Sequence, residues 1–158
     1  MTYDRARLRK ELIRDEGLRL KTYRCTAGKL SIGVGRNLDD VGIRAAEYQK
    51  LGITKASAIK NGITEDQAMA LLDSDIDVVE AQLDRALPWW RQMSPVRQRV
   101  ILNMCFNMGL RTLLTFRNTL RYMRTGDYAA AARGMANSRW HRQVGNRAIR
   151  LENMMRGV

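Results

Sequence analysis

Residues 15–35 read DEGLRLKTYRCTAGKLSIGVG, and this stretch decides the fold of the first part of the chain. The residues before it carry apolar side chains at helical spacing, namely Leu8, Leu12 and Ile13. This spacing predicts a helix over about residues 3–14, and Gly17 supplies a stop directly after Glu16. The pattern therefore predicts that Glu16 stands at the end of the first helix.

A β-hairpin is expected immediately after Glu16. Residues 19–24 and 29–34 are typical of two short strands, and Ala27-Gly28 between them predicts a reversal of the chain. Cys25 and Ser31 fall on this hairpin. The sequence thus predicts an acid at a helix end and two small polar side chains on the hairpin that follows it.

Helical patterns dominate the rest of the chain. One or two short helices are expected in the region after the hairpin, for example over residues 43–51, and a long helix begins at Thr64 and runs to about Leu87. Thr64 and Gln67 have the spacing of a capping box, in which each side chain bonds the backbone N–H of the other residue. A further helix opens at Pro95 and is apolar almost all round, so it is expected at the centre of a core. The remaining helices are expected over residues 117–125, 127–137 and 146–156.

The predicted fold class is α+β and mostly helical. A small hairpin lobe covers about residues 15–63, a connecting helix covers 64–87, and residues 88–158 with the first helix form a larger helical lobe. A chain of 158 residues, 45% of them hydrophobic, is large enough to bury such a core as a single domain. In this arrangement a cleft is expected between the lobes, where Glu16 and the hairpin face a polymer.

The charge of the chain predicts a polyanionic partner. Lys and Arg outnumber Asp and Glu by 28 to 16, which gives a formal net charge of +12. An acidic cell-wall polymer, an anionic lipid surface or a nucleic acid would each satisfy this charge, and charge alone does not choose among them. Residues 146–156 form a basic amphipathic pattern that predicts a lid on the core, with contact to an anionic membrane surface as the alternative.

No metal or cofactor site is expected, because His141 is the single histidine and no cysteine pair has ligand spacing. His141 is expected at the surface or beside a cleft. Cys25 lies in a polar hairpin and Cys105 in an apolar helix, so both are expected to be free thiols. No apolar window approaches membrane-spanning length and no apolar signal core opens the chain, so a cytoplasmic location is expected.

Three motifs together resemble the phage lysozymes, the endolysin muramidases of glycoside hydrolase family 24. The first is Glu16, eight residues, Cys25, five residues and Ser31. The second is Asn103-Met104-Cys105-Phe106-Asn107-Met108-Gly109, and the third is Ser138-Arg139-Trp140 followed by Gln143 and Asn146-Arg147-Ala148. The resemblance covers nearly the whole chain and implies a lysozyme-like fold.

The resemblance also implies catalytic roles for Glu16, Cys25 and Ser31. Cleavage of a glycosidic bond needs a proton donor for the leaving oxygen, and Glu16 is its natural source. Many members carry Asp where this chain has Cys25, and this chain is similar to the subgroup with Cys. Cys25 then either positions the attacking water together with Ser31, which an inverting mechanism favours, or attacks the anomeric carbon as a thiolate. The alternatives are that Glu16 only pairs with Arg147 and that Cys25 is a small buried hydrophobe.

Further site residues follow from matching positions. The resemblance implies substrate contacts at Asn37, Phe106 and Thr119, and supporting roles for Trp140, Gln143, Asn146 and Arg147. Another contact position of the family falls on Gly134, which has no side chain to offer. Trp89, Trp90 and Trp140 could stack on sugars, but aromatic residues between helices are expected in the core. An ion pair between Arg36 and Asp75 is also predicted, because a relative has a histidine and an aspartate at these positions.

The function predicted from the sequence is an endolysin. It would hydrolyse the β-1,4 bond between N-acetylmuramic acid and N-acetylglucosamine in peptidoglycan, as a monomer and without cofactor, and would lyse the host at phage release. It would leave the cytoplasm for the periplasm through holin lesions. The alternatives are a tail-associated lysozyme for wall penetration and a non-catalytic basic protein that binds cell wall or nucleic acid, although no specific nucleic-acid motif stands out.

Overall fold

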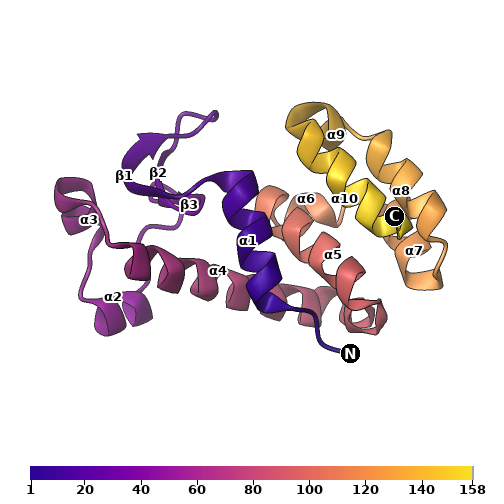
Figure 1. Cartoon of the computed structure of the whole chain (residues 1–158), viewed down its shortest axis with the longest axis horizontal. Helices are drawn as coiled ribbons and strands as arrows, with labels where there is room; N and C mark the ends of the chain where they lie inside the picture. The colour runs from indigo at the N-terminus through magenta and orange to yellow at the C-terminus, as the bar shows by residue number, and fades with distance from the viewer. Residues whose placement is uncertain (158) are drawn as a thin grey trace. The chain divides into compact units, whose positions relative to one another are not determined.

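The computed structural model describes residues 1–157 of the chain (Figure 1). The chain forms two compact units. The sheet unit is Arg9–Asp77, and the helical unit is Met1–Leu8 together with the residues from Val78 onward. The unit boundaries fall inside helices α1 (Arg5–Glu16) and α4 (Glu65–Ala86). The predicted α+β, mostly helical class is confirmed.

The sheet unit contains a three-stranded antiparallel sheet in the order β1-β2-β3 (Figure 1). Strand β1 (Arg19–Arg24) has the bounds expected from the sequence, whereas β2 (Leu30–Gly33) is shorter than the predicted strand over 29–34. The prediction was wrong here because Gly33 and Gly35 have φ of 67° and 66°, and this left-handed backbone turns the chain instead of extending it. A third strand, β3 (Arg36–Asn37), follows the turn and was not predicted.

The helices of the sheet unit begin and end at local sequence signals. Helix α1 continues to Glu16, and the N–H of Gly17 closes it on the carbonyl of Ile13 at 2.8 Å. Helices α2 (Ala45–Leu51) and α3 (Lys55–Asn61) follow the sheet. The capping box of α4 is confirmed, with Thr64 N–H donating to Gln67 Oε1 at 2.9 Å and Gln67 N–H donating to Thr64 Oγ1 at 3.1 Å.

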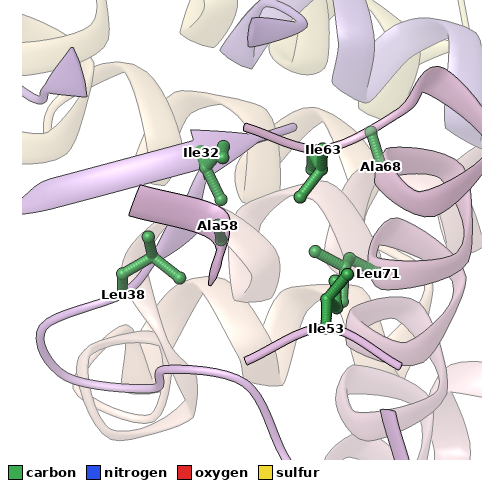
Figure 2. Packing of buried hydrophobic residues seen from close by; sticks show 7 residues of the cluster. All are labelled: Ile32, Leu38, Ile53, Ala58, Ile63, Ala68 and Leu71. Atoms are coloured by element: carbon green, nitrogen blue, oxygen red, sulfur yellow. The ribbon is translucent and has the colours of Figure 1, made fainter. Parts of the chain in front are cut away.

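A compact apolar core holds these elements together (Figure 2). Ile32 enters it from β2, Ala58 from α3 and Leu71 from α4. The whole cluster consists of Ile32, Leu38, Ile53, Ala58, Ile63, Ala68 and Leu71. Burying a large aliphatic side chain stabilises a fold by roughly 2 kcal/mol. The cluster therefore fixes β2, which carries Ser31, on the helices of its own unit.

The helical unit is built around helix α5 (Pro95–Met108), whose residues 98–105 are all buried, as the sequence predicts. The chain enters it through a short 3-10 helix, η1 (Pro88–Gln92), which was not predicted. Trp90 is fully buried, which confirms the expected core position, and its indole N–H donates to Asp84 at 2.9 Å. The other helices are α6 (Leu110–Leu113), α7 (Arg117–Thr125), α8 (Tyr128–Ala136), α9 (Arg139–Val144) and α10 (Asn146–Arg156).

Helix α10 packs as a lid on this core, against α5 and α8. Ala148, Leu151 and Met155 are buried on its inner face, so most of its apolar stripe is used for packing, and Ile149 stays exposed. The N-terminal residues also belong to this unit, because the Tyr3 hydroxyl donates to Glu80 at 2.8 Å. Within residues 1–157 no helix combines the length and apolarity needed to span a membrane.

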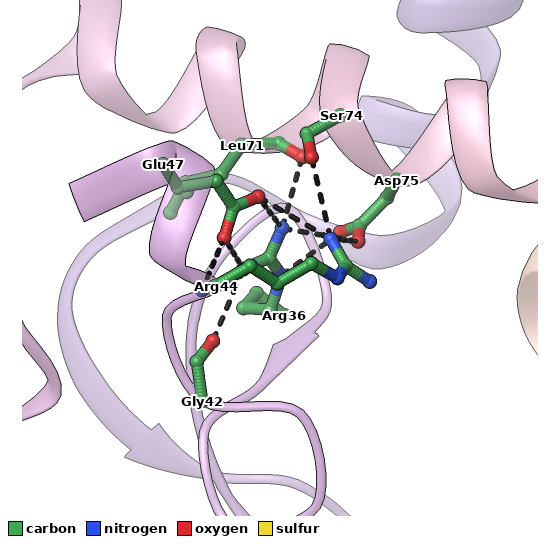
Figure 3. A network of polar contacts seen from close by, with 7 residues as sticks. All are labelled: Arg36, Gly42, Arg44, Glu47, Leu71, Ser74 and Asp75. Atoms are coloured by element: carbon green, nitrogen blue, oxygen red, sulfur yellow. Dashed lines mark hydrogen bonds and ion pairs between the residues drawn. The ribbon is translucent and has the colours of Figure 1, made fainter. Parts of the chain in front are cut away.

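A buried guanidinium ties the sheet to two helices (Figure 3). Arg36 lies in β3, and its side chain is almost completely buried. It donates to both oxygens of Glu47 on α2 at 2.7 and 2.6 Å, and to both oxygens of Asp75 on α4 at 3.1 and 3.0 Å. The carbonyls of Gly42 and Leu71 accept two further hydrogen bonds. The predicted Arg36–Asp75 pair is confirmed, and Glu47 is a second partner that the sequence did not suggest.

The ion pairs and hydrogen bonds around Arg36 change the pKa of Glu47. Burial alone raises the pKa of this carboxyl. Hydrogen bonds from Arg36, the Arg44 N–H and Ser74, together with the charge of Arg36, bring the pKa down from 4.5 to about 2. A lowered pKa in the folded state means that the ionised form stabilises the fold at neutral pH.

We expect Glu47→Gln to lower the free energy of unfolding at pH 7 by about 3 kcal/mol, because it leaves the buried guanidinium with one carboxylate instead of two. The wild-type contribution is fully present above pH 4.5 and is lost as the pH falls toward 2, so the two proteins should converge there. Urea unfolding at pH 7 and at pH 2.5 measures this difference. The exposed Glu65→Gln serves as the control, and a gap that stayed constant with pH would contradict the assignment.

Candidate active site

Glu16, the last residue of α1, lies directly against the turn that joins β2 to β3. A Cβ placed on Gly35 would lie only 2.9 Å from Glu16 Oε1 and 3.2 Å from Glu16 Cγ. Gly35 also has a φ of +66°, which side chains rarely adopt. Two independent reasons therefore favour glycine at position 35. The backbone conformation disfavours a side chain, and the half-buried carboxyl group of Glu16 leaves no room for one.

Cys25 and Ser31 are joined through one backbone carbonyl. Cys25 directly follows β1, and its N–H donates to the carbonyl of Lys29 at 2.9 Å. The buried hydroxyl of Ser31 donates to the same carbonyl at 3.2 Å. The carbonyl of Cys25 in turn accepts the N–H of Gly28 at 2.8 Å. The hairpin turn therefore places the thiol and the hydroxyl beside each other.

The two cysteines have opposite electrostatic environments. The N–H of Lys29 lowers the pKa of the Cys25 thiol, burial opposes this, and the N–H of Ala27 and the hydroxyl of Ser31 lower the pKa further. Cys105 is buried in α5, where desolvation raises the pKa of its thiol to about 11. Both are free thiols, as expected. Cys25 therefore ionises more readily than an ordinary thiol, and the donors that favour its thiolate are hydrogen-bonding groups of the hairpin.

Tyr23 belongs to the same cluster, although it was not singled out in the sequence. It lies in β1 directly opposite Ser31 in the strand register, and the guanidinium of Arg19 lies 4.7 Å from the centre of its ring. Burial raises the pKa of its phenol, and the charges of Glu16 and Cys25 raise it further, while Arg19 lowers it. A sequence signal was available, because Tyr23 precedes Cys25 by two residues and a strand places such residues on one face.

The side-chain amide of Asn37 forms hydrogen bonds within the turn that follows β3. Its Nδ2 donates to Asp40 at 3.0 Å, and its Oδ1 accepts the N–H of Asp40 at 2.8 Å. In the strand register Asn37 stands opposite Ser31. Four of the predicted site residues, Glu16, Cys25, Ser31 and Asn37, therefore belong to the sheet unit, and the others belong to the helical unit.

A pocket of about 820 Å³ opens in the helical unit and collects three of the predicted residues, Thr119, Trp140 and Gln143. Thr119 is buried against Gly134, where a Cβ would lie 2.3 Å from Thr119 Oγ1, so the missing side chain makes room for the threonine. The indole N–H of Trp140 donates to Asn107 at 2.7 Å, which places Trp140 in the core, as expected, as well as at the pocket wall.

The remaining predicted residues lie outside the lining of this pocket. Phe106 is half-buried on α5, and Asn146 is exposed at the start of α10. Arg147 is buried, and its Nε donates to Asn103 at 2.9 Å. His141, expected at the surface or beside a cleft, is partly exposed, and its Nδ1 lies 2.5 Å from the buried Glu152. This contact joins α9 to α10.

No group of three or more His, Cys, Asp or Glu side chains within residues 1–157 could hold a metal ion. Among the predicted site residues of the sheet unit, Glu16 offers a carboxyl group, Cys25 a thiol with a lowered pKa and Ser31 a hydroxyl.

Comparison with known proteins places this arrangement in context. The family model described as phage lysozyme matches residues 14–156. The chain is 30% identical to probable T4-type lysozyme 1 of Dictyostelium discoideum over 146 residues, which cover 87% of this chain and 86% of the relative. It is 32% identical to an endolysin of Acyrthosiphon pisum secondary endosymbiont phage 1, covering 75% of this chain and 68% of the relative. It is also 30% identical to the pre-baseplate central spike protein Gp5 of Enterobacteria phage T4, covering 89% of this chain but 26% of that protein.

The geometry around Cys25 predicts its reactivity. We expect iodoacetamide to modify Cys25 with a pH midpoint below that of an ordinary thiol, because the thiolate is the reacting species and its pKa is lowered. Ser31→Ala should move this midpoint to higher pH, since it removes one donor. Peptide mapping by mass spectrometry follows both cysteines at once, and Cys105 serves as the internal control that stays unmodified. A Cys25 midpoint at or above the ordinary thiol value would refute the role of the hairpin donors.

Proposed function

Because this chain belongs to the phage lysozyme family and is a glycoside hydrolase of the lysozyme type, we propose that it is an endolysin that lyses a bacterial host at phage release. Its substrate is the β-1,4 bond between N-acetylmuramic acid and N-acetylglucosamine in peptidoglycan. The observation that carries this proposal is the placement of Glu16 and the Cys25–Ser31 pair in one cluster of the sheet unit, within the segment that matches the family.

In this proposal Glu16 is the general acid. It gives its proton to the glycosidic oxygen as the bond to the anomeric carbon breaks, so the leaving sugar departs as an alcohol. Its contact with Gly35 supports this role, because a carboxyl group confined by backbone holds a fixed position relative to the hairpin.

Cys25 and Ser31 position the attacking water on the other side of the reacting carbon. The Ser31 hydroxyl can hold the water oxygen, and the Cys25 thiolate accepts one water proton as the new carbon–oxygen bond forms. The lowered pKa of Cys25 supports the role of base. The alternative, in which the thiolate itself attacks the anomeric carbon, requires a covalent intermediate and retention of configuration.

The outer parts of the substrate are assigned to other residues. We assign sugar contacts to Asn37, Phe106 and Thr119, and supporting roles to Trp140, Gln143, Asn146 and Arg147. The grouping of Thr119, Trp140 and Gln143 around one pocket supports the assignments in the helical unit. The net charge of +12 supports an acidic wall polymer as the partner of a protein that acts as a monomer.

The lytic role is supported by the relative named endolysin. In this role the protein accumulates in the host cytoplasm and reaches the periplasm through lesions opened by a holin. The second candidate is a tail-associated lysozyme, which the similarity to a central spike protein supports, although that protein is about four times as long as the matched segment. A phage that lacks this chain would distinguish the two, since an endolysin is needed for release and a tail lysozyme for entry.

We expect the wild-type protein to clear outer-membrane-stripped Gram-negative cell walls with the appearance of new muramic acid reducing ends, and Glu16→Gln to lose at least about a hundredfold in rate. Cys25→Ala should lose activity as well, and Cys25→Asp should retain part of it because a carboxylate can also accept the water proton. Proton NMR of the first product formed should show inversion at the anomeric carbon. Retention would instead support the thiolate nucleophile, and intact walls with folded wild-type protein would support a non-catalytic wall-binding protein.

Gly35→Ala tests the position of the acid without altering any reacting group. The added Cβ would crowd Glu16 Oε1, so we expect the activity to fall by about tenfold or more, since a misplaced acid loses its alignment with the leaving oxygen. Gly126→Ala is the matched control, because Gly126 follows α7 in the helical unit, has a φ of +85° and has nothing within 4 Å of the added Cβ. Both variants should lose about 1 kcal/mol of stability. Equal activity of the two variants would show that the contact with Gly35 does not position Glu16.

A further inference from the structure

Tyr23 stands among all three proposed catalytic residues. In the register of β1 and β2 it is the direct partner of Ser31, and directly opposed side chains lie about 5 Å apart on one face of a sheet. Cys25 follows two residues later, and Glu16 is close enough for its charge to act on the phenol. None of the roles assigned above uses this side chain.

The ring of Tyr23 is held in place and its hydroxyl stays protonated. The guanidinium of Arg19 lies 4.7 Å from the ring centre, in the geometry of a cation–π contact. Burial and the negative charges of Glu16 and Cys25 raise the pKa of the phenol above its ordinary value of 10. Near neutral pH Tyr23 is therefore a neutral hydrogen-bond donor within the electrostatic range of Glu16 and Cys25 when these ionise.

The other charged groups on β1 itself are Lys21 and Arg24, and Arg24 pairs with Asp39 at 3.7 Å. On the hairpin, Lys29 pairs with Asp40 at 3.3 Å. Helix α3, which packs against β1, carries Lys55 and Lys60, and Lys55 pairs with Asp39 at 3.7 Å. Glu16, Cys25 and Arg19 are the charged groups that act on the ionisation of Tyr23.

Resting on the proposed function, we propose that Tyr23 is a positioning residue whose neutral hydroxyl stabilises the charge that moves between Glu16 and Cys25 during the reaction. At the start of the reaction Cys25 carries the negative charge and Glu16 its proton. When Glu16 has protonated the leaving oxygen and Cys25 has taken a proton from the water, the negative charge lies on Glu16. The Tyr23 hydroxyl stabilises the negative charge first on Cys25 and then on Glu16, and it keeps its own proton throughout.

The coupling can be tested without any activity measurement. With tyrosine labelled by carbon-13 at Cζ, the Tyr23 resonance should shift in two steps as the pH is raised, one for each neighbour that ionises. Glu16→Gln should abolish one step and Cys25→Ala the other. Tyr48, which is exposed on α2, is the control, and its resonance should titrate identically in the wild-type protein and in both variants. A Tyr23 resonance that is unaffected by both variants would overturn the proposal.

Kinetics on soluble peptidoglycan fragments test the consequence for the reaction. Tyr23→Phe keeps the ring and removes the donor, so kcat should fall about tenfold, the value of a hydrogen bond to a charged group, while KM changes by less than about twofold. Ionisation of Glu16 and Cys25 becomes less favourable without the donor, so both limbs of the pH profile of kcat/KM should move to higher pH. Tyr48→Phe should leave the profile unchanged.

A merely structural role for Tyr23 would lower the plateau of the profile and leave both limbs in place, and that result would overturn the proposal. Thermal unfolding confirms that Tyr23→Phe is folded. An inactive wild-type protein would refute the proposed function instead, and the NMR titration would still decide whether Tyr23 is coupled to Glu16 and Cys25.

Discussion

The buried guanidinium of Arg36 is the constraint on which the sheet unit depends. A strand of two residues contributes little stability of its own, and β3 is such a strand. Removing a charge from water is expensive, so the side chain of Arg36 can stay buried only where carboxylates and carbonyls surround it. Glu47 and Asp75 supply this environment from two helices, and Arg44, which donates to Asp75 at 3.0 Å, balances the second carboxylate. Gly35 immediately precedes Arg36, so the junction that fixes β3 also fixes the glycine against which Glu16 lies.

The hairpin lowers the pKa of the Cys25 thiol mainly through hydrogen bonds and not through a neighbouring positive charge. The ammonium of Lys29 pairs with Asp40, and it is the backbone N–H of the same residue that lowers the pKa of Cys25. Backbone donors are fixed by the turn, so they favour a thiolate without the reorganisation that a mobile side chain would need. The carbonyl of Lys29 meanwhile accepts hydrogen bonds from the Cys25 N–H and the Ser31 hydroxyl, so one backbone carbonyl links the two residues. The position of Ser31 therefore depends on the geometry of the turn more than on the size of its side chain.

Local signals predicted the elements whose ends are encoded by neighbouring residues. β1, α7 and α10 have the bounds expected from the sequence, and the capping box of α4 is present, because propensity, caps and glycine stops act within a few residues. The Arg36–Asp75 pair was predicted from the resemblance, whereas Glu47 was not, because it reaches the guanidinium only through the packing of α2. Strand β3 and the position of Tyr23 opposite Ser31 also escaped prediction, since both depend on which residues face each other across the sheet. The fold class, most of the longer elements and the family match were thus readable from the sequence, and the contacts that hold the matching residues in place were not.

The excess positive charge and the proposed catalytic residues lie in different parts of the chain. Residues 109–145 contain seven arginines and one acid, Asp127, whose carboxylate caps α8 by accepting the N–H of Ala130. The excess positive charge of this segment attracts any polyanion and weakens with salt, so it can raise the rate of encounter with a wall polymer but cannot select a bond to cleave. In the sheet unit, by contrast, arginines such as Arg9 and Arg36 are used in ion pairs within the fold. In the proposed mechanism, selection comes instead from Glu16, Cys25 and Ser31, which lie against glycine, backbone and buried ion pairs and whose positions are much less sensitive to salt.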